Sequence, residues 1–320
     1  MQQHPEQTFA LSCVVPAYNE AGNLERVLAD IHGALSALTD RFEIILVNDG
    51  SRDDTARVAR QLAAGCPQLV VIDLSRNFGK EAAISAGLDC ALGDAVILMD
   101  GDGQHPVTLL PAMVEKWRSG LDIVYAVRKT RTDQSALYSL GTRIFYQLVN
   151  YNSRFHIPPD AGDFRLMDRK VVSALAHLPE RNRFMKGLYS WVGYSSIGLE
   201  YEPLPRAEGK SHYGIAGGLR LALTGLLSFS TLPLKILSVA GALLSLVSML
   251  YILEVLFEYF YWGIAVPGYA TLIVSIMFFS GIQLLALGVM SAYIGHIYEE
   301  VKRRPVYLVR DKTGTGLGRQ

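Results

Sequence analysis

The chain has 320 residues, of which 50% are hydrophobic and 19% charged, and its mean hydropathy is +0.22. This composition excludes a disordered chain, a collagen-like fibre and a small disulfide-stabilised protein. Thirty basic and thirty acidic side chains give a formal net charge of zero. Because no global basic field exists to attract nucleic acid, we expect no nucleic-acid partner.

Charge and cysteine usage indicate a cytoplasmic first half. Residues 1–213 hold 22 basic and 25 acidic side chains, whereas residues 214–320 hold 8 and 5. Cys13, Cys66 and Cys90 lack metal-finger or CxxC spacing, which is typical of reduced thiols in a cytosolic compartment. The N-terminal residues have neither the basic region nor the apolar core of a signal peptide.

Short apolar runs alternate with helical patterns over the first 130 residues. The expected strands are Leu11–Val15, Phe42–Val47, Leu69–Leu74, Ala95–Met99 and Asp122–Val127. The expected helices are Leu24–Leu38, Asp53–Ala64, Lys80–Leu92 and Pro106–Trp117. This alternation predicts an α/β fold, a doubly wound and mostly parallel sheet with helices on both faces.

In such a sheet, ligands bind outside the carboxyl ends of the strands. Asp100 and Asp102 follow the fourth run, with Gln104 two residues further on. Alternate positions project to one side and offer hard oxygen ligands, which favours Mg²⁺ or Mn²⁺ bridged to a diphosphate. The alternative is a turn that caps the helix expected at Pro106, but a single acid would suffice for that.

Other strand ends allow two interpretations each. Asp49 either sits in a simple turn or accepts hydrogen bonds from a nucleobase or ribose. Glu20 either occupies a first helical turn or joins the same site. A dinucleotide GxGxxG, a P-loop and a GxSxG motif are all absent from the sequence, which disfavours an oxidoreductase, an ATPase and a hydrolase of those types.

Arginines and acids further along the chain suggest a phosphate clamp. Arg128 leaves the fifth strand and Arg206 precedes the apolar region, so their guanidinium groups are placed to hold a phosphate near a membrane. One of the acids Asp160 and Asp163 either caps a helix or pairs with Arg165, or it orients an acceptor.

The C-terminal part predicts a membrane anchor. Ile236–Leu253 is uncharged, and residues 259–295 contain no Asp, Glu, Lys or Arg but are interrupted at Pro267, so we expect two transmembrane helices. Basic residues flank the pair and put both termini in the cytoplasm. Residues 139–151 and 213–232 are expected to lie on the membrane surface, although a third span at 214–232 is the rival interpretation.

Together the strand-end motifs resemble those of family 2 inverting glycosyltransferases. Within the family they are similar to the polyprenyl-phosphate glycosyltransferases, such as dolichyl-phosphate mannose synthase and bacterial undecaprenyl-phosphate glucosyltransferases. The motifs are Pro16-Ala-Tyr-Asn-Glu20, Asn48-Asp-Gly-Ser51, Asn77-Phe-Gly-Lys80, Asp100-Gly-Asp-Gly-Gln-His-Pro106, Gly162-Asp-Phe-Arg165 and Arg206-Ala-Glu-Gly-Lys-Ser-His-Tyr213.

The resemblance implies a GT-A domain, a nucleotide diphosphate sugar as donor and a homo-oligomer such as a tetramer. It implies nucleotide-sugar contacts at Pro16, Tyr18, Glu20, Asp49, Lys80 and Asp100. It places the metal on Asp102 and Gln104, catalytic roles on Asp102 and Asp163, and donor or lipid phosphate on Arg128, Arg131, Arg206 and Ser211.

We therefore expect a multi-pass inner-membrane enzyme that transfers a hexose, with UDP-glucose favoured, to polyprenyl phosphate at the cytoplasmic face. Its parts would be a catalytic domain (residues 1–212), interfacial helices (213–234), two transmembrane helices (235–298) and a basic cytoplasmic tail (299–320). Transfer of mannose or N-acetylhexosamine is the alternative. A processive polysaccharide synthase is disfavoured by the lack of a QxxRW motif, and a silent scaffold by the intact acids.

Overall fold

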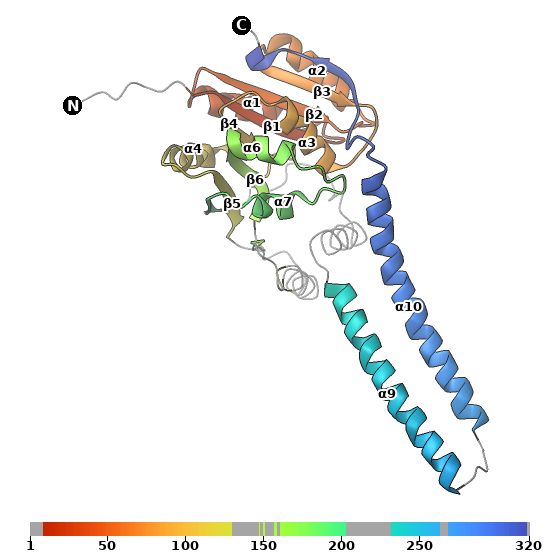
Figure 1. The fold of residues 1–320 in the computed structure, drawn as a ribbon. Helices are drawn as coiled ribbons and strands as arrows, with labels where there is room; N and C mark the ends of the chain where they lie inside the picture. Colours follow the sequence, from red (N-terminus) through yellow and green to blue (C-terminus); the bar gives the residue numbers. More distant parts are fainter. Residues whose placement is uncertain are drawn as a thin grey trace.

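The computed structural model describes residues 9–129, 147, 150, 157–158, 161–202, 232–262 and 268–318. Figure 1 shows an α/β domain from which a long helical hairpin projects. Arg131, Arg206 and Ser211 lie outside the described residues, as do almost all of the two segments expected on the membrane surface and the rival third span.

A single eight-stranded sheet forms the centre of the domain, with strand order β7-β5-β6-β4-β1-β2-β3-β8. Strands β6 and β8 run antiparallel to their neighbours, and the other pairings are parallel. This confirms the predicted mostly parallel sheet. The strands are β1 Leu11–Ala17, β2 Phe42–Asn48, β3 Leu69–Leu74, β4 Ala95–Leu98, β5 Ile123–Arg128, β6 Ala161–Asp168, β7 Ser196–Tyr201 and β8 Val309–Thr313.

Helices cover both faces of the sheet because its central strands are apolar on both sides. Every residue of β1 to β4 is buried, as expected for parallel strands between two helical layers. The helices are α1 Leu24–Ser36, α2 Thr55–Gly65, α3 Lys80–Cys90, α4 Leu110–Arg118, α6 Arg169–Ala176 and α7 Met185–Trp191, with 3₁₀ turns η1 Val107–Leu109 and η2 Gly316–Gly318.

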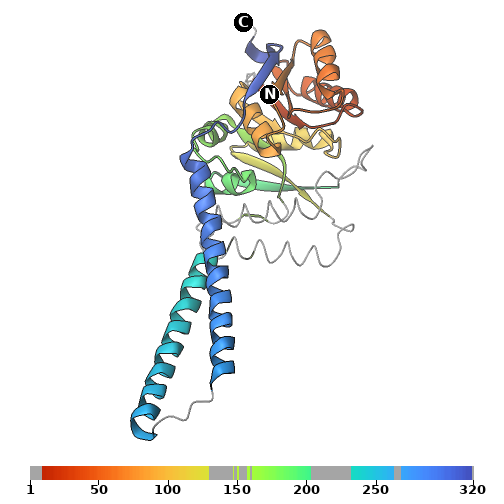
Figure 2. The same ribbon diagram turned by 90° about the vertical axis from the view of Figure 1, so that its right-hand side faces the viewer.

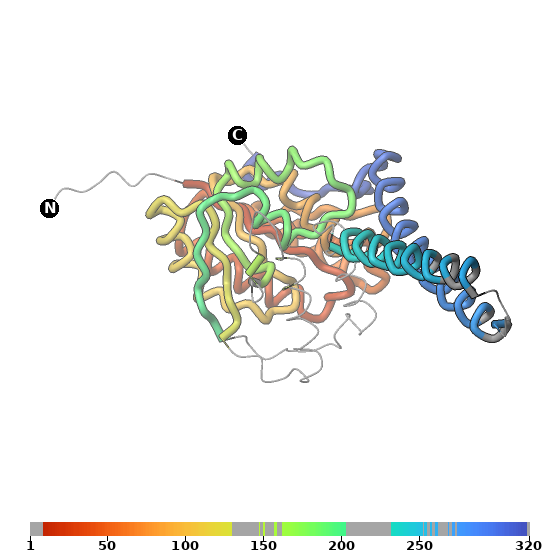
Figure 3. The backbone as a smooth tube through the Cα atoms, turned by 60° about the horizontal axis from the view of Figure 1, so that its bottom comes forward, coloured from red at the N-terminus to blue at the C-terminus, as the bar shows by residue number. Residues whose placement is uncertain are grey.

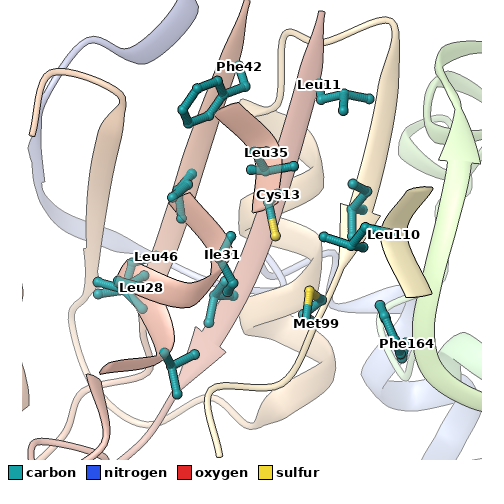
Figure 4. Close-up of a cluster of buried hydrophobic side chains, with 14 of the residues drawn as sticks. Leu11, Cys13, Leu28, Ile31, Leu35, Phe42, Leu46, Met99, Leu110 and Phe164 are labelled. Carbon is teal, nitrogen blue, oxygen red and sulfur yellow. The ribbon is translucent and has the colours of Figure 1, made fainter. Parts of the chain in front are cut away.

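The hydrophobic core has two halves, one on each face of the sheet. In the first, α1, α2 and α4 pack on the sheet, and this half includes Met113 of α4. Figure 4 shows part of it, with Ile31 of α1 and Phe164 of β6. Helices α3, α6 and α7 fill the second half with residues such as Ile84 and Met185. Alternate residues of β6 therefore face different layers, and Asp163 faces the layer of α3 and α7.

Two long apolar helices form the hairpin, α9 Leu232–Trp262 and α10 Tyr269–Val301. Both contain segments long and apolar enough to cross a membrane, Leu232–Tyr251 and Val274–Val301, and neither segment is buried against the rest of the protein. Figures 2 and 3 show the hairpin extending away from the sheet domain.

The chain returns to the domain after α10, within the segment expected to be a basic tail. β8 pairs antiparallel with β3 and closes that edge of the sheet. The carbonyl of Leu308 accepts a hydrogen bond from the backbone N–H of Ser75 at 2.9 Å, directly after β3. The hairpin therefore joins the domain at the carboxyl edge of the parallel strands.

Candidate active site

The loop after β2 holds the loop that leads into α3. The two carboxylate oxygens of Asp49 accept the backbone N–H groups of Phe78 and Gly79 at 2.7 and 2.9 Å. Gly50 has φ +61°, and a Cβ there would lie 2.4 Å from the carbonyl carbon of Arg76. Burial raises the pKa of Asp49, and the two N–H donors partly offset that effect. Asp49, predicted to contact the nucleotide, thus also fixes the position of Lys80.

Lys80 joins three parts of the site. Its Nζ lies 2.6 Å from Oδ1 of Asp100, after β4, and 2.7 Å from Oδ2 of Asp163 on β6. Burial of the ammonium group acts to lower the pKa of Lys80, but the two carboxylate charges outweigh it and hold that pKa well above its usual value. The structure therefore brings together three of the predicted site residues in one ionic cluster.

His105 holds the loop that carries Asp100. Its Nδ1 accepts the backbone N–H of Asp100 at 3.1 Å, and its ring stacks on Phe164 at 4.7 Å. Burial lowers the pKa of His105 against the opposing charges of the two nearby aspartates, so the imidazole is neutral at pH 7. Sequence reasoning gave His105 no role, because its partner Phe164 is brought beside it only by the fold.

The predicted metal ligands lie in the same loop. Oδ1 of Asp102 accepts the backbone N–H of Gln104 at 3.0 Å across Gly103, whose φ of +72° favours glycine. Arg128, at the end of β5, donates to Oε1 of Gln104 at 3.4 Å and to the hydroxyl of Tyr201 at 3.2 Å. The predicted phosphate clamp thus contacts a predicted metal ligand.

The end of β1 contributes the remaining predicted nucleotide contacts. Pro16 lies opposite Val47 in the β1–β2 register, and Tyr18 follows the strand. Glu20 accepts a hydrogen bond from the side chain of Asn23 at 3.1 Å. These residues lie at the same carboxyl edge as Asp49, since β1 and β2 are parallel neighbours.

Asp163 occupies a layer of buried polar groups between β6, α3 and α7. Burial acts to raise the pKa of Asp163, but Lys80 and Lys186 outweigh it and hold that pKa well below its usual range. The ion-pair partner of Asp163 is Lys80, whereas Arg165 donates to the carbonyl of Gly162 at 2.6 Å and lies over the Tyr189 ring.

Sequence reasoning missed Glu81 and Lys186 in this layer. Burial, followed by the charge of Asp163, raises the pKa of Glu81 to about 8. The backbone N–H of Met185, at the start of α7, hydrogen-bonds to this glutamate. The sequence contained one signal for Glu81. Lys80 and Glu81 are adjacent charged residues in the first turn of α3, and the seven residues that follow them are all small or apolar.

Comparisons with known proteins agree with this arrangement. The model of glycosyl transferase family 2 matches residues 12–176. An uncharacterized glycosyltransferase of Synechocystis sp. (strain ATCC 27184 / PCC 6803 / Kazusa) is 45% identical over 96% of this chain and 96% of its own. The SfII prophage-derived bactoprenol glucosyl transferase of Shigella flexneri is 41% identical over 94% of this chain and 97% of its own.

A solved structure of glucosyl-3-phosphoglycerate synthase from Mycobacterium tuberculosis is 20% identical, with a TM-score of 0.46 over 68% of this chain and 79% of that one. The family match and the mixed sheet with its polar carboxyl edge define a glycosyltransferase with a GT-A fold. The chain belongs to glycosyl transferase family 2, as its motifs predict.

Proposed function

We propose that this enzyme transfers glucose from UDP-glucose to a polyprenyl phosphate, with inversion at the anomeric carbon. The observation that carries the proposal is the position of the apolar hairpin, which joins the domain at the same edge as Lys80 and its two carboxylates. A lipid acceptor held in a membrane would meet a donor bound at that edge. The names of relatives such as the bactoprenol glucosyl transferase of Shigella flexneri support the same acceptor and sugar.

On the donor side, the chain supplies fixed positive charge where negative charge develops. As the phosphate oxygen of the acceptor bonds to the anomeric carbon, the bond from that carbon to the diphosphate breaks and its electrons remain on the diphosphate. Lys80 and Arg128 are cations at this edge, and both are oriented by hydrogen bonds or ion pairs before substrate binds. Such preorganised charges contribute several kcal/mol to catalysis, about 3 to 4 for one well-placed donor.

A divalent cation, Mg²⁺ or Mn²⁺, fits the donor set of this loop. Asp102 and Gln104 offer hard oxygen atoms, while the described residues contain no group of three or more acidic, His or Cys side chains able to hold a metal alone. Mg²⁺ commonly uses one or two carboxylates and takes its other ligands from substrate phosphates and water. When bound, the ion would neutralise charge on the departing diphosphate.

Asp163 is better suited to orient the acceptor than to remove a proton from it. A phosphate monoester has a second pKa of about 6, so it is mostly a dianion at neutral pH and needs no strong base. Lys80 and Lys186 keep the carboxyl of Asp163 ionised through their effect on its pKa, which makes it a weak base. We assign Asp163 the role of positioning Lys80 and the acceptor.

We further propose that the hairpin crosses the membrane twice and that the catalytic domain and C-terminus share the cytoplasmic side. Because β8 pairs with β3, the chain must return to the domain after α10. An even number of spans brings it back to the side of the membrane on which the domain lies. Lys302, Arg303 and Arg304 follow α10 directly, and basic residues favour the cytoplasmic side.

The test is transfer by the purified full-length enzyme in detergent, with a panel of UDP- and GDP-linked sugars and a short polyprenyl phosphate. We expect the enzyme to form glucosyl polyprenyl phosphate from UDP-glucose at least tenfold faster than it forms product from any other donor. NMR should identify the product as the inverted anomer. Preference for another sugar would overturn the donor assignment. Transfer to water or to a growing glycan instead of lipid phosphate would overturn the acceptor assignment.

A further inference from the structure

A cavity of about 100 Å³ lies on the side of the sheet that α7 covers, the side that Asp163 also faces. Its walls come from β5, β6, α7, the start of β7 and the residues Ile157 and Pro158, and they include Arg165, Lys186 and Tyr189. Arg165 follows Asp163 by two residues and therefore faces the same layer. Arg128 lies elsewhere, since it binds Tyr201, which belongs to the core on the opposite face of the sheet.

Two residues that line the cavity carry buried hydrogen-bond donors without acceptors. Nε of Arg165 and the hydroxyl of Tyr189 are buried and have no partner among the described residues. The two side chains are only 3% and 4% exposed. Lys186 also lines the cavity, and its ammonium group forms no ion pair within 4 Å with another described residue. A buried donor left unpaired is costly, so two such donors in residues that line one cavity, with the half-buried Lys186 beside them, indicate a missing acceptor.

The charge around the cavity also suits an anion. Lys80 on α3 is matched by the carboxylates of Asp100 and Asp163. Glu81, the other acid that faces this layer, is mostly neutral at pH 7 because burial and Asp163 raise its pKa to about 8. The guanidinium of Arg165 and the ammonium of Lys186 then leave an excess of one positive charge.

We propose that this cavity binds a phosphate group through Arg165, Lys186 and the hydroxyl of Tyr189. A phosphate presents several acceptor oxygens, which match a guanidinium, an ammonium and a hydroxyl converging from different sides. The phosphate comes either from the headgroup of a lipid phosphate or from free inorganic phosphate. The first source rests on the proposed function, whereas the site itself does not.

The binding test is calorimetric titration of the full-length protein in detergent with inorganic phosphate, with UDP present in excess to occupy the donor site. Lys186→Met should weaken phosphate binding about tenfold or more, because it removes a charged donor. Lys186→Arg should restore most of the affinity. Tyr189→Phe, which removes only the hydroxyl, should weaken binding several-fold without lowering the melting temperature.

The matched control is Lys170→Met. Lys170 also lies near this region, 5.9 Å from the ring of Tyr194, but it pairs with Asp122 and does not line the cavity. Its substitution should leave phosphate affinity unchanged. Equal affinity in wild type and Lys186→Met, or no phosphate binding by the wild type at millimolar concentration, would overturn the proposal and mean that water fills the cavity.

Competition then identifies the source. If a short polyprenyl phosphate displaces inorganic phosphate from the wild type, the lipid headgroup occupies the site, and Lys186→Met should raise the KM for the lipid more than it lowers kcat. If it does not displace inorganic phosphate, free phosphate is the ligand and the site still stands. Phosphate binding is measured without sugar transfer. The binding result therefore remains valid even if the enzyme does not carry out the proposed glucosyl transfer.

Discussion

Lys80 and Asp163 lie 2.7 Å apart and form the ion pair that connects the start of α3 to the antiparallel strand β6. The pair places a permanent cation and a permanent anion beside Asp100, at the edge where a donor diphosphate would bind. The ion pair stabilises the charged form of both groups. It holds the pKa of Lys80 well above its usual value and the pKa of Asp163 well below its usual value, although burial acts against both shifts. The pair is therefore ionised throughout the physiological pH range.

Asp163→Asn should lower turnover about 100-fold or more, and the loss should persist from pH 6 to pH 9. The variant loses the anion that orients Lys80, and pH cannot restore that alignment. The measurement is a pH–rate profile at saturating lipid phosphate, with Asp30→Asn, at an exposed position of α1, as control. If Asp163 were instead a general base, full ionisation of the lipid phosphate would rescue the variant, so near wild-type turnover above pH 8 would exclude the positioning role.

The parallel half of the fold was predictable because its strands are continuous apolar runs. β1 to β5 and the helices between them match the predicted ranges within a few residues. β6 was not predicted, since Asp163 and Arg165 interrupt its apolar pattern to serve the site. β8 was not predicted either, because Val309–Thr313 is mostly exposed and joins the sheet through backbone pairing with β3.

The candidate site was predictable only as far as strand ends reveal it. Asp49, Asp100 and Asp102 follow strands, so the carboxyl-edge rule groups them from the order of residues alone. Glu81 and Lys186 lie inside helices, where a charged residue usually marks a solvated face. Their burial beside Asp163 depends on how α3 and α7 pack on β6, and the spacing of residues along the chain does not contain that information.

Asp102→Asn should lower turnover by at least 100-fold while the melting temperature stays within about 2 °C of wild type, because the change removes one charged oxygen ligand and keeps the shape. EDTA should abolish wild-type turnover, and added Mg²⁺ or Mn²⁺ should restore it. The comparison of turnover with melting temperature separates loss of metal from loss of fold. Full activity of Asp102→Asn, or of the wild type in excess EDTA, would disprove metal dependence at this loop.

Glu300 at the end of α10 accepts the backbone N–H groups of Arg181 and Asn182, at 2.8 and 3.1 Å. Glu300→Ala leaves both donors unpaired and should destabilise the protein by about 1 to 3 kcal/mol. Glu299→Ala is the matched control, because it removes only an exposed ion pair with Lys302 and should change the melting temperature little. Equal melting temperatures for the two variants would show that the contact does not tie the hairpin to the domain.

Impermeant thiol labelling tests the topology. A cysteine at Gly268, between α9 and α10, should be labelled from outside intact cells, and one at Asp311 on β8 should be labelled only after lysis. Asp311 is an exposed position, whereas a side chain at Gly316 would lie 2.4 Å from Glu43 and disturb the sheet edge. The reverse labelling pattern would contradict the proposed orientation.

Glu81→Gln should change how stability depends on pH. The pKa of Glu81 is about 8 in the folded protein, against a usual value of 4.5. At pH values between these two pKa values, the folded protein holds a proton that the unfolded chain has released. The free energy of unfolding therefore falls as pH rises through this range. Glutamine does not titrate but keeps an acceptor for Met185, and the variant should lack this decline. Relative to wild type, it should therefore gain roughly 3 kcal/mol between pH 5 and pH 8.

The measurement is the melting temperature of both proteins from pH 5 to pH 8.5, with Glu115→Gln on the exposed face of α4 as control. The control should run parallel to wild type, because an exposed glutamate has nearly the same environment in the folded and unfolded chain. The Glu81→Gln curve should lie closest to the wild-type curve at the acid end, where the unfolded chain also begins to hold the proton. Parallel curves for all three proteins would mean that Glu81 is ionised in the folded protein and that the layer around Asp163 carries no excess positive charge.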